Sequence, residues 1–189
     1  YYDPITTGDS TLSAVVQSVV AAEVGYHEVA YGYFLDALYV DLANSHNNTV
    51  DGLHIASTGG VWCALVNGFG GMRDHDGRLS FDPRLPDGWT SLTFRLTWRG
   101  TLLRVDLTAA SLTLRVEDGE MPVPVVVGGT THTVAEDSPV VVVLDGHGPR
   151  IPGIIPKRPQ TGGTRTDGSR ITAGVPSAIP LPDPDPATA

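Results

Sequence analysis

The sequence is poor in cysteine and in long apolar runs, and each shortage excludes a class of protein. Cys63 is the single cysteine in 189 residues, so no internal disulfide framework can form, and a reducing compartment, the cytoplasm, is expected. No apolar run reaches about 18 residues, the length that predicts a membrane-spanning helix. The histidines show no metal-ligand spacing with one another or with Cys63, so we expect no metal site. No other cofactor is expected.

Basic residues are also scarce. The chain has 12 Lys+Arg against 21 Asp+Glu, a net charge of -9. Such an acidic body repels the phosphate backbone of a nucleic acid, so nucleic-acid binding is not expected.

The apolar spacing changes along the chain and predicts an α+β protein. Residues 8–72 show the helical period, which predicts a first helix ending at Gly25, a second over residues 26–42 and a third beginning near Ser57. From about 78 to 145 the period becomes two, which predicts six to eight short strands in an antiparallel β-sandwich. Helices that are apolar around much of their circumference need partners that a small sandwich cannot supply.

The last segment has a different composition. Residues 148–189 hold nine of the chain's fifteen prolines and show no apolar period. We therefore predict a disordered tail there. The expected division is 1–72 for the helical part, 73–147 for the sandwich and 148–189 for the tail.

The stretch from Asp51 to Trp62 carries the most chemical information. It places His54 before two hydroxyls, Ser57 and Thr58, and then two glycines, all entering a helix. The first turn of a helix has unpaired N–H groups and the positive end of the helix dipole, so a phosphate or carboxylate could bind there. The alternative is an ordinary capped helix, with Ser57 as the N-cap and His54 as a structural residue.

The tryptophans and the cysteine have simpler interpretations. Trp89 and Trp98 could stack on a sugar, but the alternation along its strand favours Trp98 as a core residue. Cys63 lies beside Trp62 in an apolar helix with no basic neighbour, which favours a packing role over a nucleophilic one.

Four motifs together resemble the family of maltose, trehalose and kojibiose phosphorylases, glycoside hydrolase family 65. They occur in order at the expected separations over roughly residues 1–108. They are Thr6-Thr7-Gly8-Asp9-Ser10-Thr11-Leu12-Ser13, the Asp51–Trp62 stretch, Gly68-Phe69-Gly70-Gly71-Met72-Arg73 and Leu79-Ser80-Phe81-Asp82-Pro83-Arg84-Leu85-Pro86.

The resemblance implies the last helices of an (α/α)6-barrel catalytic domain followed by a C-terminal β-sandwich. It implies that His54, Ser57 and Thr58 bind phosphate, a co-substrate, and that Asp9 shapes the active site, although a plain N-cap is an alternative for Asp9. It also implies an inverting mechanism whose general-acid Glu lies upstream, so we expect no catalytic residue in this chain. The pair Ser57-Thr58 departs mildly from the family pattern and leaves phosphorolysis or hydrolysis open.

Two functions from different classes follow. The first is the C-terminal part of an α-glucosyl disaccharide phosphorylase or hydrolase, inactive without its upstream catalytic segment. Its partners would be an α-glucoside disaccharide and phosphate, and the family leaves a homodimer as an option. The second is a non-catalytic carbohydrate-binding or structural module.

Overall fold

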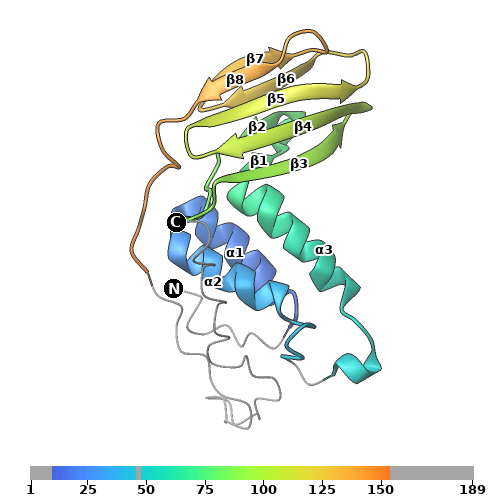
Figure 1. Cartoon of the computed structure of the whole chain (residues 1–189), viewed down its shortest axis with the longest axis vertical. Coiled ribbons are helices and arrows are strands. Elements are labelled where there is room, and N and C mark those ends of the chain that lie inside the picture. The colour runs from blue at the N-terminus through green and yellow to red at the C-terminus, as the bar shows by residue number, and fades with distance from the viewer. Residues whose placement is uncertain (1–9, 46–47, 154–189) are drawn as a thin grey trace, which may run out of the picture.

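The computed structural model describes residues 10–45 and 48–153, which form a layer of helices beside two β-sheets (Figure 1). Helices come first along the chain and strands follow. The predicted α+β composition is confirmed. A complete (α/α)6 barrel stays a prediction, and the predicted disorder of residues 154–189 lies outside the described residues.

Helices α1 (Ser13–Val24) and α2 (His27–Leu38) form an antiparallel pair. Gly25 ends α1 in the left-handed conformation, with φ of 106°, as predicted. The buried hydroxyl of Ser18 donates to the carbonyl of Ala30 at 2.8 Å and joins the two helices. The prediction for α2 was too long, because the helix ends at Leu38 and a series of turns continues to Ser45.

The third helix begins two residues earlier than predicted and changes type near its end. A 3-10 turn, η2 (Thr49–Asp51), precedes α3 (Ile55–Cys63), which continues as a π-helix, η3 (Ala64–Phe69). Gly60 allows α3 to approach α1 closely, because a Cβ there would lie 2.7 Å from a methyl of Val15. Cys63 is half-buried and packs against the helical core, in agreement with the predicted packing role.

The strands form two four-stranded sheets that share one hydrophobic core. One sheet has the order β1-β2-β6-β7 and the other β3-β4-β5-β8. Pairing is antiparallel as predicted, except that β2 and β6 are parallel. The bounds are β1 (Met72–Arg73), β2 (Leu79–Phe81), β3 (Ser91–Trp98), β4 (Thr101–Thr108), β5 (Ser111–Asp118), β6 (Val123–Val127), β7 (Thr130–Val134) and β8 (Val140–Val143), with a 3-10 turn η4 (His75–Gly77) between β1 and β2.

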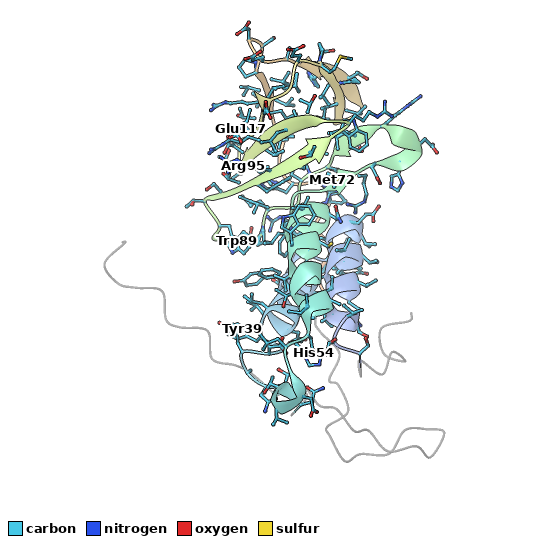
Figure 2. All side chains as sticks on the ribbon, turned by 90° about the vertical axis from the view of Figure 1, so that its right-hand side faces the viewer. Tyr39, His54, Met72, Trp89, Arg95 and Glu117 are labelled. Carbon is cyan, nitrogen blue, oxygen red and sulfur yellow. The ribbon has the colours of Figure 1, made fainter. Side chains whose placement is uncertain are left out.

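An aromatic cluster joins the helical layer to the sheets. Trp89, in the loop before β3, lies between the two layers (Figure 2) and makes edge contacts with the rings of Tyr31, Phe34 and Phe69. These ring centroids lie 5.6–6.1 Å from that of Trp89. Trp89 therefore has a packing role at the junction, not the sugar-stacking role considered above.

The chain returns from the sheets to the helices after β8. Arg150 forms a two-contact ion pair with Asp87, which lowers the pKa of that carboxyl, and the N–H of Ile151 donates to the carbonyl of Gly25. Residues 148–153, the first part of the predicted tail, thus have defined contacts with both layers. No helix in the described ranges has the length and apolarity needed to cross a bilayer.

Gly71 lies at the joint between η3 and β1 and should not tolerate a side chain. Its φ is 64°, and a Cβ there would overlap the carbonyl oxygen of Asp82. We expect Gly71→Ala to lower the free energy of unfolding by about 3 kcal/mol, measured by urea denaturation. Gly88→Ala is the matched control: its φ is also positive but the space is open, so a loss of about 1 kcal/mol is expected. Equal losses at the two positions would contradict the steric argument.

Two buried histidines beside the returning segment should make stability depend on pH. Burial, and then the charges of Arg150 and Arg84, lower the pKa of both His27 and His147 below 6.5. The unfolded chain therefore binds protons more readily than the folded chain. The free energy of unfolding is consequently at its full value above pH 6.5 and decreases as the pH drops below that value.

Thermal melting followed from about pH 8 to pH 5 should show this fall, since histidine is the side chain that titrates in that range. His147→Leu should weaken the dependence, whereas substitution of the exposed His75 should leave it unchanged. A melting temperature of the His147→Leu variant with the same pH dependence as the natural chain would refute the assignment.

Candidate phosphate site at the start of helix α3

The residues predicted to bind phosphate lie at the N-terminus of α3, at the end of the helical layer remote from the sheets (Figure 2). His54 occupies the N-cap position, and the helix begins at Ile55. The turns after α2 and η2 surround this end of the helix. The site is therefore built from three consecutive elements of the chain.

His54 is held on both sides by polar side chains. Asp41 accepts hydrogen bonds from the backbone N–H of His54 at 2.9 Å and from its ring Nδ1 at 2.6 Å. On the other side, Nε2 lies 3.2 Å from the amide nitrogen of Asn48. A carboxylate that contacts Nδ1 fixes the ring orientation and assigns a hydrogen to that nitrogen.

The two hydroxyls point to different partners. Ser57 is 2% exposed, and its hydroxyl donates to the backbone carbonyl of Thr11 at 3.0 Å. This contact ties α3 to the segment before α1, and Ser57 is not the N-cap. Thr58 is exposed, and its hydroxyl donates to the carbonyl of His54 at 3.3 Å. Thr58 thus shares the N-terminal end of the helix with His54, whereas the hydroxyl of Ser57 is buried against another element.

Backbone N–H groups complete the site. The N–H of Thr58 makes the first helical hydrogen bond, to the carbonyl of His54, and that of Ile55 is bonded to Leu53. Among the described residues, the N–H groups of Ala56 and Ser57 have no acceptor. Such groups, at the positive end of the helix dipole, are suited to an anion. Gly59 keeps the adjacent surface open, because a Cβ there would meet no atom within 4 Å.

Sequence reasoning missed Asp41 and Asn48, the two residues that orient His54. The available signal was Asp41 itself, a carboxylate between apolar neighbours at the end of a helix, 13 positions before His54. Asp9, predicted to shape the active site, lies outside the described residues. Within the part of the chain that the structure describes, no three His, Cys, Asp or Glu side chains gather as metal ligands would.

Comparison with known proteins assigns the chain to a family. A sequence model of the glycosyl hydrolase family 65 central catalytic domain matches residues 1–63, and one of the C-terminal domain of the same family matches residues 72–134. The chain belongs to glycosyl hydrolase family 65. The predicted resemblance is confirmed, and the α3 site lies within the part matched by the central catalytic domain.

Relatives in family 65 extend this result. An uncharacterised glycosyl hydrolase of Mycobacterium leprae is 44% identical over 153 residues, which are 80% of this chain and 19% of that protein. The α,α-trehalose phosphorylase of Thermoanaerobacter brockii is 44% identical over 120 residues, 64% of this chain and 16% of that protein. A solved structure from the human microbiome, provisionally described as a kojibiose phosphorylase, has a TM-score of 0.71 and 26% identity over 78% of this chain and 21% of its own. The chain thus spans about a fifth of the length of these similar proteins.

Removing the charge of Asp41 should destabilise this end of the helical layer. In Asp41→Asn, one of the two hydrogen bonds to His54 loses its acceptor and the other loses its charge. We expect the free energy of unfolding to fall by about 1–3 kcal/mol in urea denaturation. Asp51→Asn, at an exposed position of η2, is the control and should change stability little. Equal effects of the two substitutions would argue against a positioning role for Asp41.

Proposed function

We propose that this chain is the C-terminal part of an inverting α-glucosyl disaccharide phosphorylase of the trehalose, maltose or kojibiose type, or of a related glycoside hydrolase. The observation that carries the proposal is the start of α3, where His54, Thr58 and two N–H groups with no acceptor among residues 10–45 and 48–153 occupy one helix terminus. Relatives named trehalose phosphorylase and kojibiose phosphorylase support an α-glucoside and phosphate as substrates. The free thiol of Cys63 supports a cytoplasmic location.

In the proposed reaction, phosphate attacks the anomeric carbon from the face opposite the leaving sugar. A glutamic acid protonates the glycosidic oxygen as that bond breaks, giving β-glucose 1-phosphate and the free second sugar. We assign the glutamic acid to the part of the parent protein that precedes this chain. Phosphate is already an anion, so it requires positioning, which a helix N-terminus supplies.

The hydrogen bonds of Ser57, Thr58 and His54 indicate how each residue would contact phosphate. We assign Ser57 a contact through its backbone N–H, because its hydroxyl is already donated to Thr11. Thr58 is exposed and can turn its hydroxyl from the carbonyl of His54 to a phosphate oxygen. For His54, the contact of Nδ1 with Asp41 leaves Nε2 as an acceptor, which can receive the O–H of a monohydrogen phosphate in place of the Asn48 amide.

The helical layer also carries an apolar surface that suits a larger protein. Leu12, Val16, Val20 and Val24 follow one another every four residues along one side of α1 and are each between 42% and 61% exposed. Residues at this spacing share one face of a helix. A stripe of this kind, in a chain that spans a fifth of its relatives, supports packing against further helices of a longer polypeptide. On this proposal the chain alone is inactive.

The test is a kinetic comparison in the full-length protein that contains this chain, with trehalose, maltose and kojibiose as substrates. Cleavage should require phosphate and release glucose 1-phosphate. Thr58→Ala and His54→Gln should each raise the KM for phosphate by about tenfold, the cost of one hydrogen bond to a charged group, with little change in the KM for the disaccharide. Thr133→Ala, at an exposed position of β7, is the matched control for Thr58→Ala.

Different outcomes would revise different parts of the proposal. Cleavage that is independent of phosphate would assign the protein to the hydrolases of the family. An unchanged KM for phosphate in both variants would show that His54 and Thr58 do not bind phosphate. Turnover by residues 1–189 alone would contradict the assignment of the general acid to another part of the protein.

A further inference from the structure

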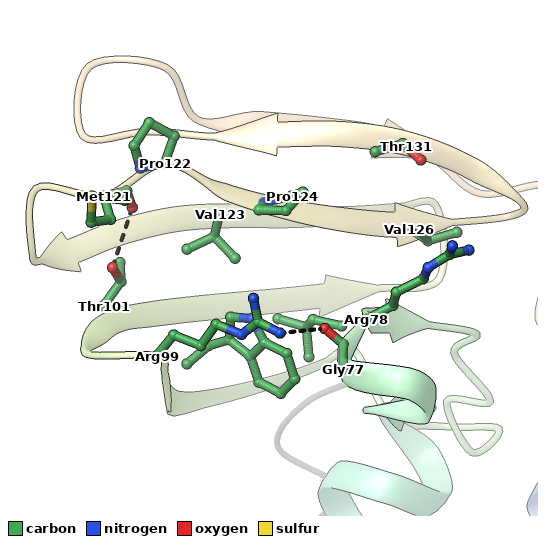
Figure 3. Close-up of a pocket in the computed structure, with 12 residues that line it drawn as sticks. Gly77, Arg78, Arg99, Thr101, Met121, Pro122, Val123, Pro124, Val126 and Thr131 are labelled. Atoms are coloured by element: carbon green, nitrogen blue, oxygen red, sulfur yellow. Dashed lines mark hydrogen bonds between the residues drawn. The ribbon is translucent and has the colours of Figure 1, made fainter.

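A cavity lies among the strands, separate from the α3 site. It is formed by the β3–β4 hairpin, the start of β2, and strands β6 and β7, and has a volume of about 370 Å³ (Figure 3). None of its lining residues belongs to α1, α2 or α3. The side chains that define it are Arg78, Trp98, Arg99, Pro122, Pro124 and Thr131. Its volume is at the lower end of the range for small-molecule sites, about 300–1,000 Å³.

The cavity has an unusual charge for this protein. Two arginines and no carboxylate line it, in a chain whose net charge is -9. Five of the other six arginines in the described residues are paired with carboxylates, as Arg95 is with Glu117 on the outer face of the sheet (Figure 2), and Arg115 is the exception. Within those residues neither Arg78 nor Arg99 has a carboxylate within ion-pair distance. The cavity therefore offers unneutralised positive charge to an anion.

Arg99 lies beside the cavity in an unfavourable backbone conformation. Arg99 and Gly100 form the two-residue turn between β3 and β4, with φ of 50° and 87°. Asparagine, aspartate or glycine usually occupies the first position of such a turn, because positive φ is costly for longer side chains. The guanidinium donates to the carbonyl of Gly77 at 2.9 Å and lies 5.6 Å from the centroid of the Trp98 ring (Figure 3).

The rest of the wall is apolar. Trp98 is half-buried, so the prediction of a core role is only partly met: it packs against the sheet core and also lines the cavity. Pro122 and Pro124 add rigid apolar surface, and Thr131 adds a hydroxyl. A ligand for this wall needs a ring with a C–H face as well as an anionic group. A sugar phosphate has both, because a pyranose ring packs against apolar and aromatic surfaces while its phosphate pairs with arginine.

We propose that this cavity is a binding site for a monosaccharide phosphate, with Arg78 and Arg99 as the phosphate ligands, Arg99 being supported by the Trp98 ring beneath it, and with Pro122 and Pro124 as the sugar platform. The volume suits one sugar ring with its phosphate. The choice of a sugar phosphate among anionic ring compounds rests on the proposed function, whereas the position and charge of the site do not. The site lies away from the α3 helix terminus, so it binds the product of the proposed reaction without taking part in catalysis.

Isothermal titration calorimetry on the 189-residue chain carrying His54→Gln and Thr58→Ala, which weaken the proposed α3 phosphate site, tests the proposal with β-glucose 1-phosphate, inorganic phosphate and glucose as separate probes. We expect one molecule of glucose 1-phosphate per chain, bound at least about tenfold more tightly than either simpler probe. Arg99→Asn and Arg78→Gln should each weaken this binding by about tenfold or more. Arg115→Gln, which removes an exposed arginine outside the cavity, should leave it unchanged.

The Arg99→Asn variant keeps the test independent of folding. Asparagine is favoured at positive φ, so this substitution should maintain or raise the melting temperature while it removes the guanidinium. Undetectable binding of glucose 1-phosphate at millimolar concentration, equal binding of phosphate alone, or unchanged binding in both cavity variants would overturn the proposal. Because binding is measured without turnover, failure here leaves the proposed phosphorolysis unaffected, and absence of phosphorolysis in the full-length protein leaves this measurement valid.

Discussion

The contact of Trp89 with the helices is the interaction on which the arrangement of this protein depends. The sheets and the helices have separate hydrophobic cores, and Trp89 packs against both. Its edge contacts with Phe34 and Phe69 place the loop before β3 directly over the end of η3. The bond from the N–H of Arg84 to the carbonyl of Phe69 fixes the same loop through the backbone. The relative position of the two layers therefore follows from a small set of contacts near one loop.

That arrangement separates two sites with different chemistry. The start of α3 offers backbone N–H groups and an oriented imidazole at the end of the helical layer remote from the sheets. The cavity beside the β3–β4 hairpin offers arginines and a tryptophan within the sheets. Both suit a phosphate group, and the cavity adds an apolar wall for a sugar ring. We infer that the part of the protein matched by the C-terminal domain of family 65 has a binding role of its own.

The α3 site shows how far sequence reasoning reaches. The glycines and hydroxyls after His54 predicted a helix N-terminus suited to an anion, because unpaired N–H groups occur at every such terminus. The sequence did not reveal that Ser57 would turn inward to Thr11, because that contact joins residues 46 positions apart. Nor did it reveal that Asp41 would orient His54, because that contact depends on how the turns after α2 fold back toward the start of α3.

Periodicity and turn residues alone determined the order of helices and strands and the end of α1 at Gly25, and four short motifs indicated the family. These features depend on local backbone preferences and on short motifs, which are written in consecutive residues. Only the tertiary structure decided the parallel pairing of β2 with β6, the inward turn of Ser57 and the gathering of Arg78, Trp98 and Arg99 around one cavity. Each of these joins residues distant in sequence, and their pairing is set by the packing of the two layers, which no local pattern encodes.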